Sequence, residues 1–315
     1  MQKPAVDILM AVYNGERYLP EQIASLQAQT HQNWRLLVAD DGSSDGTVEM
    51  LQRLAQEDPR IVVLDREVGN LGPCQRFLWL LDKATADYIL FADQDDVWDQ
   101  TKVETLLDTV ILEEKEHGAA QPVCAFCDAE VVNEQLQTIS PSFLAYEHFD
   151  PVGIDLRHLL VNNVAPGCTM ILNRALADTL ELPDDLSQII MHDWWVLLTA
   201  AALGTVTFVD APLLKYRQHG GNASGAGGFN VMRYLPLVRK VAEAHQRCQR
   251  QAGAFVQAYS RKLSASDLEL CRAYATMGHH GLRPALTIAK YGLWQPGLAR
   301  RAAQIVLPII CPLPE

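Results

Sequence analysis

Residues 88–98, YILFADQDDVW, constrain this 315-residue chain more than any other stretch. The first five residues are apolar and favour extended backbone, which predicts a buried β-strand. The strand would end at Asp93, Gln94, Asp95 and Asp96, where three carboxylates within four residues repel one another. Such a cluster favours a hard divalent cation, held by one or two carboxylates and by the phosphates of a substrate. A solvated acidic turn that begins the following helix is the alternative.

Before this segment, short apolar runs alternate with amphipathic stretches. Strands are predicted over residues 6–12, 34–39 and 61–64, and helices over residues 16–29, 47–56 and 74–83. Near-continuous apolar strands that alternate with helices predict a parallel sheet with helices on both faces. Ligands of such sheets bind beyond the carboxyl ends of the strands. We therefore expect three segments that follow strands, Tyr13-Asn14, Asp40-Asp41 and residues 93–96, to meet in one crevice.

The pattern is looser after residue 99. Strands are predicted over residues 123–126, 130–133, 167–172 and 205–209, and helices over residues 102–116, 156–164, 191–203, 229–250, 252–263 and 266–277. The glycine-rich segment at 224–228 predicts a domain boundary. It would separate a domain over residues 1–224 from a helical region over residues 225–315.

Charge divides the chain at the same place. Residues 229–301 contain twelve Lys and Arg against three Asp and Glu, whereas residues 1–228 contain fourteen against thirty-four. The acidic part is a poor surface for nucleic acid, so no nucleic-acid partner is expected. The basic and apolar tail predicts either contact with an anionic surface, such as that of a membrane, or a helical bundle. Such a bundle would pack on the first domain or form a homodimer.

Composition argues against a membrane-spanning protein, a secreted protein and a zinc protein. No run of about 18 apolar residues is present, so no membrane span is expected, and the N-terminus has no signal-peptide pattern, which predicts a cytoplasmic protein. Cys124 and Cys127 form a CxxC motif without a second pair. Reduced thiols in the core are therefore expected rather than a zinc site.

Six motifs stand in one order along the chain: ILMAVYNGERYL, LLVADDGSSDGT, GNLGPCQR, YILFADQDDVW, HDWW and YRQHGGN. In this order and spacing, over residues 5–224, they resemble the family-2 glycosyltransferases. The resemblance implies a GT-A fold, which is a Rossmann-like mixed and mostly parallel sheet with helices on both faces. It also implies inverting transfer of a sugar from a nucleotide diphosphate donor, with Mg²⁺ or Mn²⁺ as cofactor.

The acidic, HDWW and YRQHG motifs together look most like those of bacterial rhamnosyltransferases of O-antigen and cell-wall polysaccharide synthesis. This likeness implies a dTDP-rhamnose donor and a saccharide or lipid-linked saccharide acceptor. Uridine and guanosine donors stay open.

The resemblance implies which residues hold the cation and the diphosphate. Asp95 is expected to bind the metal, Asp93 to reach the metal or the ribose, and Asp96 is the alternative ligand. His219 is implied as a third ligand or a donor to the diphosphate, and a histidine caught in a glycine-rich loop is the alternative. Arg217 would either neutralise phosphate or pair with the acids around it.

The donor nucleotide is implied to bind at the ends of the first two strands. Asp41, or else Asp40, would hold the base and ribose. The other implied donor-binding residues are Ala11, Tyr13, Asn14, Arg76 and Gln94. The stretch after Asp41 is also a good turn and helix start, and both roles can hold at once.

Inverting transfer needs a general base that takes the proton of the acceptor hydroxyl. Asp193 is the implied base, at the start of an apolar helix where burial would raise its pKa. A helix cap is the alternative role for Asp193. The implied acceptor-binding residues are Gly167, Cys168, Trp194 and Trp195.

Two other functions compete with a glycosyltransferase. A nucleotidyltransferase would have a glycine-rich, basic loop after the first strand, whereas residues 13–16 are Tyr-Asn-Gly-Glu. A non-catalytic carbohydrate-binding protein of the same fold would have lost some of the acids, and all of them are present here.

Overall fold

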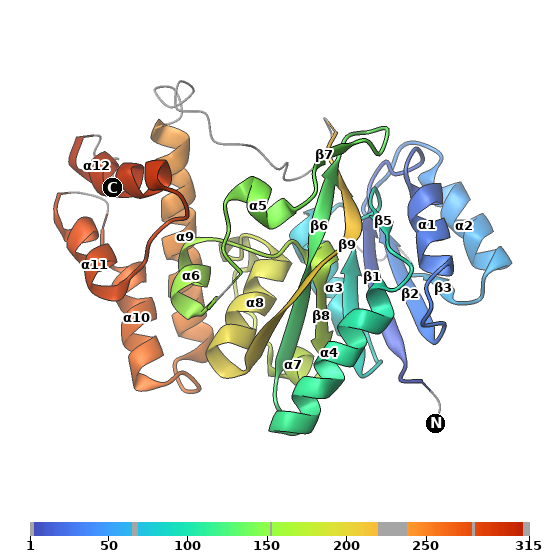
Figure 1. Ribbon diagram of the computed structural model, residues 1–315, viewed down its shortest axis with the longest axis horizontal. Helices are drawn as coiled ribbons and strands as arrows, with labels where there is room; N and C mark the ends of the chain where they lie inside the picture. Colours follow the sequence, from blue (N-terminus) through green and yellow to red (C-terminus); the bar gives the residue numbers. More distant parts are fainter. Residues whose placement is uncertain (1–2, 65–68, 152, 220–237, 279–280, 311–315) are drawn as a thin grey trace.

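The computed structural model describes residues 3–64, 69–151, 153–219, 238–278 and 281–310. Its centre is a nine-stranded sheet of order β3-β2-β1-β4-β8-β6-β9-β5, with β7 paired to β6 (Figure 1). The strands are β1 (Val6–Val12), β2 (Trp34–Asp40), β3 (Ile61–Val63), β4 (Tyr88–Ala92), β5 (Val97–Trp98), β6 (Val123–Val132), β7 (Thr138–Ser140), β8 (Met170–Asn173) and β9 (Thr205–Arg217). The helices are α1 (Leu19–Gln27), α2 (Thr47–Glu57), α3 (Gly72–Lys83), α4 (Lys102–His117), α5 (Phe143–Glu147), α6 (Leu156–Val161), α7 (Arg174–Thr179), α8 (His192–Leu203), α9 (Val238–Tyr259), α10 (Ala265–Ala275), α11 (Arg283–Tyr291) and α12 (Leu298–Ile310), with short 3-10 turns at Gly167–Thr169 and Leu186–Gln188.

The four N-terminal strands confirm the predicted parallel arrangement. β1 lies between β2 and β4, parallel to both, and β3 continues the sheet beside β2. Val12 at the end of β1 is in register with Asp40 at the end of β2. The segments that follow β1, β2 and β4 therefore leave the sheet at the same edge, as the sequence predicted.

The second half makes the sheet mixed. β8 is antiparallel to both β4 and β6, and β9 is parallel to β6. The two strands predicted over residues 123–126 and 130–133 were wrong as separate elements, because β6 is continuous through Asp128. The register with β9 shifts beside this residue, and its carboxylate accepts a bond from the Phe143 backbone amide at 3.0 Å. A polar residue at a bulge interrupted the apolar pattern without ending the strand.

Further boundaries differ from the sequence prediction. A strand was expected over residues 205–209, but β9 continues to Arg217. Residues 167–172 were expected to be one strand, but Gly167–Thr169 is a 3-10 turn and only β8 is extended. The predicted break near residue 251 is absent, since α9 runs without interruption from Val238 to Tyr259. The glycine-rich segment at 224–228 lies outside the described residues.

Helices cover both faces of the sheet. In Figure 1, α4 lies in front of the sheet, where it packs against β6, β8 and β9, and α3 lies behind it against β1. α3 also contacts α8. β1, β4, β6 and β8 are mostly apolar and almost fully buried, as expected for strands covered on both sides, whereas β9 is partly exposed.

The C-terminal helices pack on the body of the molecule, at the left of Figure 1. α9 and α10 contact α6. The ring of Phe255 on α9 meets the ring of Trp195 on α8, with the ring centres 5.4 Å apart. The hydroxyl of Thr199 on α8 donates to the hydroxyl of Tyr259 at 3.0 Å. Of the arrangements open to the tail, packing on the rest of the chain is therefore present in this structure.

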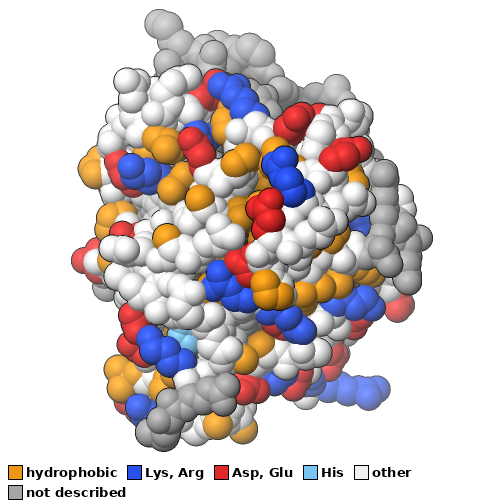
Figure 2. Space-filling view, turned by 90° about the vertical axis from the view of Figure 1, so that its right-hand side faces the viewer, with side chains coloured by type: hydrophobic (Ala, Val, Ile, Leu, Met, Phe, Trp, Pro, Cys, Tyr) orange, Lys and Arg blue, Asp and Glu red, His pale blue; other side chains and the backbone are white. Residues whose placement is uncertain are grey.

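The surface at the end of the molecule opposite the C-terminal helices carries both positive and negative side chains. Figure 2 shows this end of the molecule, where Lys and Arg side chains are interspersed with Asp and Glu. It offers no large area of one sign. Among the described residues, no helix has both the length and the apolar character that a membrane crossing requires.

Candidate active site

A cavity of about 770 Å³ opens where β1, β2 and β4 end. Sixteen residues were predicted for the site, and ten of them line this cavity. These ten are Ala11, Tyr13, Asp41, Asp93, Gln94, Asp95, Gly167, Asp193, Trp194 and His219. The six that do not line it are Asn14, Asp40, Arg76, Cys168, Trp195 and Arg217. The expected convergence of separate strand ends on one crevice is therefore present, while the role of each residue stays a prediction.

The outer side of the acidic turn faces the cavity. Nε2 of His219 lies 2.7 Å from Oδ2 of Asp95, and the His219 ring stacks on Tyr18 with ring centres 4.7 Å apart. Burial, with the nearby charges of Asp95 and Asp193, raises the pKa of Asp93 to about 7. Asp93, Asp95 and His219 thus all line the cavity, and the Asp95 carboxylate and the His219 imidazole are in contact there.

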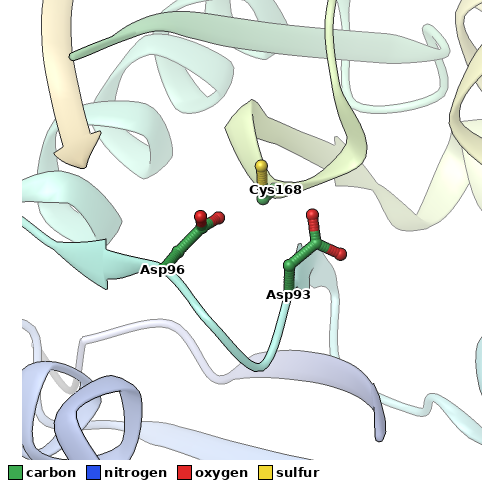
Figure 3. Close-up of side chains that lie close together, drawn as sticks. All are labelled: Asp93, Asp96 and Cys168. Carbon is green, nitrogen blue, oxygen red and sulfur yellow. The ribbon is translucent and has the colours of Figure 1, made fainter. Parts of the chain in front are cut away.

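The inner side of the turn faces the core. Figure 3 shows the carboxylates of Asp93 and Asp96 and the thiol of Cys168 pointing toward one another, and their potential ligand atoms lie within 4.8 Å. The buried Lys102 lies in the same cluster. Its ammonium donates to the Cys168 carbonyl and sits 3.3 Å from the centre of the Trp98 ring. Burial lowers the pKa of Lys102 to about 8, so near neutral pH most molecules carry this positive charge beside Asp96.

The two sides of the turn differ in their fitness for a metal ion. Oxygen and imidazole ligands suit Mg²⁺ and Mn²⁺, and the Asp93, Asp95 and His219 side has such ligands in contact with the cavity. The Asp96 and Cys168 side already contains the Lys102 cation and does not line the cavity. Asp95 and His219 therefore fit a hard divalent ion better than Asp96 and Cys168 do, and Asp93 interacts with both pairs.

A buried ion pair lies at the end of the cavity where the nucleotide is predicted to bind. The guanidinium of Arg76 on α3 donates to Oδ1 of Asp41 at 3.0 and 2.9 Å and to the carbonyl of Gly69 at 2.8 Å. The same carboxylate accepts from the backbone amides of Leu71 at 2.9 Å and Gly72 at 2.8 Å. Asp41 thus lines the cavity and also fixes the loop before α3. Arg76 does not line the cavity, and its contribution is to hold the Asp41 carboxylate in place.

Side chains also fix the backbone of the two neighbouring loops. The amide of Gln94 pairs with the Tyr13 backbone, accepting from its N–H at 2.8 Å and donating to its carbonyl at 3.0 Å. Asn14 has a positive φ of 48° and accepts from the Ser44 amide at 2.8 Å. Asp40 accepts from the Gly42 amide at 2.9 Å. Asn14 and Asp40 therefore shape the loops, and Gln94 links the acidic turn to the Tyr13 backbone.

Asp193 has a defined hydrogen-bond environment in the first turn of α8. Its carboxylate accepts from Asn163 Nδ2 at 3.0 Å and from the backbone amides of Gly167 at 2.7 Å and Trp194 at 2.6 Å. Burial raises its pKa to about 6 in spite of these bonds. The carboxylate is thus buried, oriented and mostly ionised at neutral pH, which are the properties of a general base.

Gly167 lies against Asp193 and its neighbour. A Cβ atom at position 167 would lie 2.9 Å from His192 Nε2 and 3.3 Å from Asp193 Cβ. The Gly167 backbone therefore packs closely on the start of α8, and its amide binds the Asp193 carboxylate.

Trp195 and Arg217, two of the six predicted residues that do not line the cavity, make other contacts. Trp195 was expected to meet the acceptor, but it follows Trp194 by about 100° around the helix and packs against α9 instead. Arg217 is buried, and its guanidinium binds the Glu21 carboxylate and the carbonyls of Asp95 at 2.8 Å and Glu134 at 2.6 Å. Of the two roles open to Arg217, pairing with the neighbouring acid and backbone is the one present.

Several lining residues were missed by the sequence analysis. One end of the cavity is lined by aromatic side chains and an acid, Phe143, Glu147, Phe149 and Tyr216. Glu147 pairs with Arg300 of α12 at 3.2 Å. Scattered aromatic residues look like core residues in a sequence, so only the fold could bring them to the cavity. His192 was also missed, although it adjoins the predicted base.

Comparisons with known proteins agree with this arrangement, an α/β sheet with acids at its carboxyl edge. The family model described as glycosyl transferase family 2 matches residues 7–180. The match covers more than half of the chain and includes the strand ends after β1, β2 and β4. The chain therefore belongs to glycosyl transferase family 2.

Relatives and solved structures are consistent with this family. The chain is 32% identical to an uncharacterised glycosyltransferase of Haemophilus influenzae, over 58% of this chain and 68% of the relative. It is 24% identical to the dTDP-rhamnosyl transferase RfbG of Shigella flexneri, over 73% of this chain and 79% of the relative.

Two solved structures share the fold over 96% of this chain. The S. aureus TarS 1–349 complex with UDP-GlcNAc has a TM-score of 0.54 at 16% identity, with 89% of that chain covered. The mannosyltransferase PcManGT from Pyrobaculum calidifontis, in complex with GDP-Man and Mn²⁺, has a TM-score of 0.52 at 14% identity, with 85% covered. Together with the mixed sheet described above, they confirm the predicted GT-A fold.

The Asp41–Arg76 pair yields a prediction on stability. Arg76→Met leaves a buried carboxylate without its cation, so we expect the free energy of unfolding to fall by about 3–5 kcal/mol. The double variant Asp41→Asn/Arg76→Met, which removes the buried charge as well, should recover part of that loss. Chemical denaturation of the full chain measures both.

The control is Arg53→Met, which breaks an exposed pair with Glu57 on α2 and should change stability by less than about 0.5 kcal/mol. Equal effects of Arg76→Met and Arg53→Met would contradict the structural role given to the buried pair.

Proposed function

We propose that this glycosyltransferase moves a sugar from a nucleotide-sugar donor to a saccharide or lipid-linked saccharide acceptor in bacterial surface polysaccharide synthesis. The observation that carries the proposal is that Asp41, Asp95 and Asp193, from three distant parts of the chain, line one cavity. The dTDP-rhamnosyl transferase RfbG matches most of the chain, and we propose dTDP-rhamnose as the donor.

The donor would lie along the ends of β1, β2 and β4. Its nucleoside fits between Ala11, Tyr13 and Asp41, and its diphosphate lies toward Asp95 and His219. These two residues, with Asp93, would hold Mg²⁺ or Mn²⁺, and such an ion stabilises the negative charge that grows on a departing diphosphate. The Mn²⁺ in the PcManGT complex supports this assignment.

The transfer would be a single inverting displacement. The acceptor hydroxyl oxygen forms a bond to the anomeric carbon while the bond from that carbon to the diphosphate oxygen breaks. Asp193 takes the proton of the hydroxyl, and the nucleoside diphosphate leaves with the bonding electrons. The bonds from Asn163 and the Gly167 amide orient the carboxylate for this proton transfer.

Asp95 supplies the first test of this function. Asp95→Asn keeps the shape of the side chain but removes a metal ligand, so we expect the Mn²⁺-dependent rise in melting temperature with a pyrimidine nucleoside diphosphate to be lost. Thermal shift with and without Mn²⁺ measures it. The wild-type protein should release nucleoside diphosphate from its donor. Release of pyrophosphate would indicate a nucleotidyltransferase, and no release or binding would indicate a non-catalytic protein.

The role of Asp193 predicts both a variant and a pH profile. Asp193→Asn cannot accept the proton, so transfer should fall by about 10²–10⁴-fold while donor affinity stays within about twofold. Because the pKa of Asp193 is raised to about 6, the base is protonated below that pH. The wild-type kcat/KM should therefore rise with pH through about 6 and level off above it. A rate that is unchanged in Asp193→Asn would exclude Asp193 as the base.

The C-terminal helices add a proposal on location, that of peripheral contact with an anionic membrane surface at the cytoplasmic face. Leu282, Leu286 and Leu298 are exposed on or beside α11 and α12, and Arg283, Lys290, Arg300 and Arg301 lie on the same two helices. Apolar and basic side chains together are what an anionic lipid surface binds. Arg300 also reaches Glu147 at the aromatic end of the cavity, which would place an acceptor held by lipid near that end.

Vesicle sedimentation of the full chain tests the membrane contact. We expect binding to vesicles that contain phosphatidylglycerol, little binding to neutral vesicles, and loss of binding in Leu282→Asp/Leu286→Asp. Leu112→Asp, at an exposed leucine of α4, is the matched control and should bind as the wild type does. Absence of binding together with a dimer in analytical ultracentrifugation would favour a homodimer contact through this surface instead.

A further inference from the structure

His192 is the first residue of α8 and adjoins the proposed base. Its side chain is only 3% exposed. The imidazole stacks on Phe77 with ring centres 4.1 Å apart and meets Phe91 edge-on at 4.8 Å. Two aromatic rings therefore fix its position on the inner wall between α3, β4 and α8.

Both ring nitrogens of His192 lack a hydrogen-bond partner within the described parts of the chain. Burial lowers the pKa of this histidine to about 3, so the ring is neutral near pH 7 and offers one N–H donor and one acceptor. A buried polar group without a partner costs free energy, and buried polar groups in folded proteins are almost always bonded. An aromatic ring without nitrogens would fill this place at lower cost if packing were its only role.

Another buried histidine of this chain shows the usual arrangement. His31 is 2% exposed, and its Nε2 lies 2.9 Å from the carbonyl oxygen of Pro4. It does not line the cavity. The two histidines therefore differ in two respects: the nitrogens of His192 have no protein partner among the described residues, and His192 lines the cavity.

Gly167 lies close to one nitrogen of His192, on the side of the ring that faces Asp193. A Cβ atom at position 167 would lie 2.9 Å from His192 Nε2, so any other residue would press on this nitrogen. The Gly167 amide binds the Asp193 carboxylate. Gly167, His192 and Asp193 all line the cavity, so Nε2 lies beside the carboxylate proposed to act as base.

We propose that His192 binds a hydroxyl group of the transferred sugar and helps to select the donor, a role that rests on the proposed function. The nucleoside end of the cavity is at Tyr13 and Asp41, and the diphosphate end is at Asp95. The transferred sugar must lie between the diphosphate and the base Asp193, because its anomeric carbon reacts there. His192 adjoins Asp193 and touches Phe91, two residues before Asp93, so it lies in this interval. A sugar hydroxyl can both accept and donate, and it matches a neutral imidazole.

The test compares donor affinity with and without the sugar. Isothermal titration would measure the Kd of UDP-glucose, UDP-GlcNAc, GDP-mannose and dTDP-rhamnose, and of UDP, GDP and dTDP, with Mn²⁺. His192→Phe fills the aromatic site without the nitrogens. We expect the affinity of the nucleoside diphosphate to stay within about twofold, while that of the preferred nucleotide sugar falls by about 5- to 10-fold. His192→Gln, which keeps a donor and an acceptor, should recover part of the loss.

Melting temperature separates this role from simple packing. His192→Phe should melt at or above the wild-type temperature, because it removes buried unbonded nitrogens. The matched variant His31→Phe leaves the Pro4 carbonyl without its partner, so it should melt lower while keeping the wild-type ratio of affinities. A ¹⁵N spectrum of the wild-type protein labelled at histidine gives a readout that needs no variant, since the His192 ring signals should shift with the nucleotide sugar and not with the nucleoside diphosphate.

Two results would overturn the inference. An unchanged ratio of nucleotide-sugar to nucleoside-diphosphate affinity in His192→Phe would make His192 a packing residue while the proposed function stands. His192 ring signals that do not move when a nucleotide sugar binds would likewise make it a packing residue. If the wild-type protein binds none of the nucleotide sugars, the proposed function fails and this role fails with it.

Discussion

The structure depends on how the like charges of one turn are compensated. Asp93, Asp95 and Asp96 leave β4 within four residues, in a region where low polarity strengthens their repulsion. The chain places a partner on each of two sides of them. Lys102 lies in the core beside Asp96 and Asp93, and His219 contacts Asp95 at the cavity. On the inner side the compensating charge of Lys102 is therefore part of the fold, and the outer side is the one that we propose to bind a ligand.

The loops around the cavity are held by bonds from side chains to backbone. Gln94 fixes the Tyr13 backbone, and Asp41 fixes Leu71 and Gly72. Loops after parallel strands have no ladder of their own, so each buried amide needs another partner. Here the polar residues that line the cavity provide these partners. A site whose walls are already ordered loses little conformational entropy when a ligand binds.

The sequence was sufficient for the features that depend on local pattern, and insufficient for those that depend on distant packing. The strands that end at Val12, Asp40 and Ala92 follow from apolar runs that stop at polar turns, and the parallel order brings their ends together. The partner of Asp41 could not be predicted, since Arg76 lies 35 residues away on another element. The different directions of Trp194 and Trp195 depend on the rotation of α8 relative to α9. The aromatic end of the cavity likewise depends on where α5 packs.

The C-terminal helices take part in the geometry of the proposed base, although no family motif reaches them. Gln251 on α9 is buried, and its side-chain oxygen accepts from the Ile190 amide at 2.7 Å. Ile190 lies two residues before α8 and lines the cavity. Trp195 of α8 packs on Phe255, which like Gln251 is on α9. The first turn of α8 contains a buried carboxylate and a buried imidazole, which both cost stability. The apolar contact between Trp195 and α9 offsets the free-energy cost of burying these two polar groups. The C-terminal helices therefore stabilise the end of α8 that carries the proposed base.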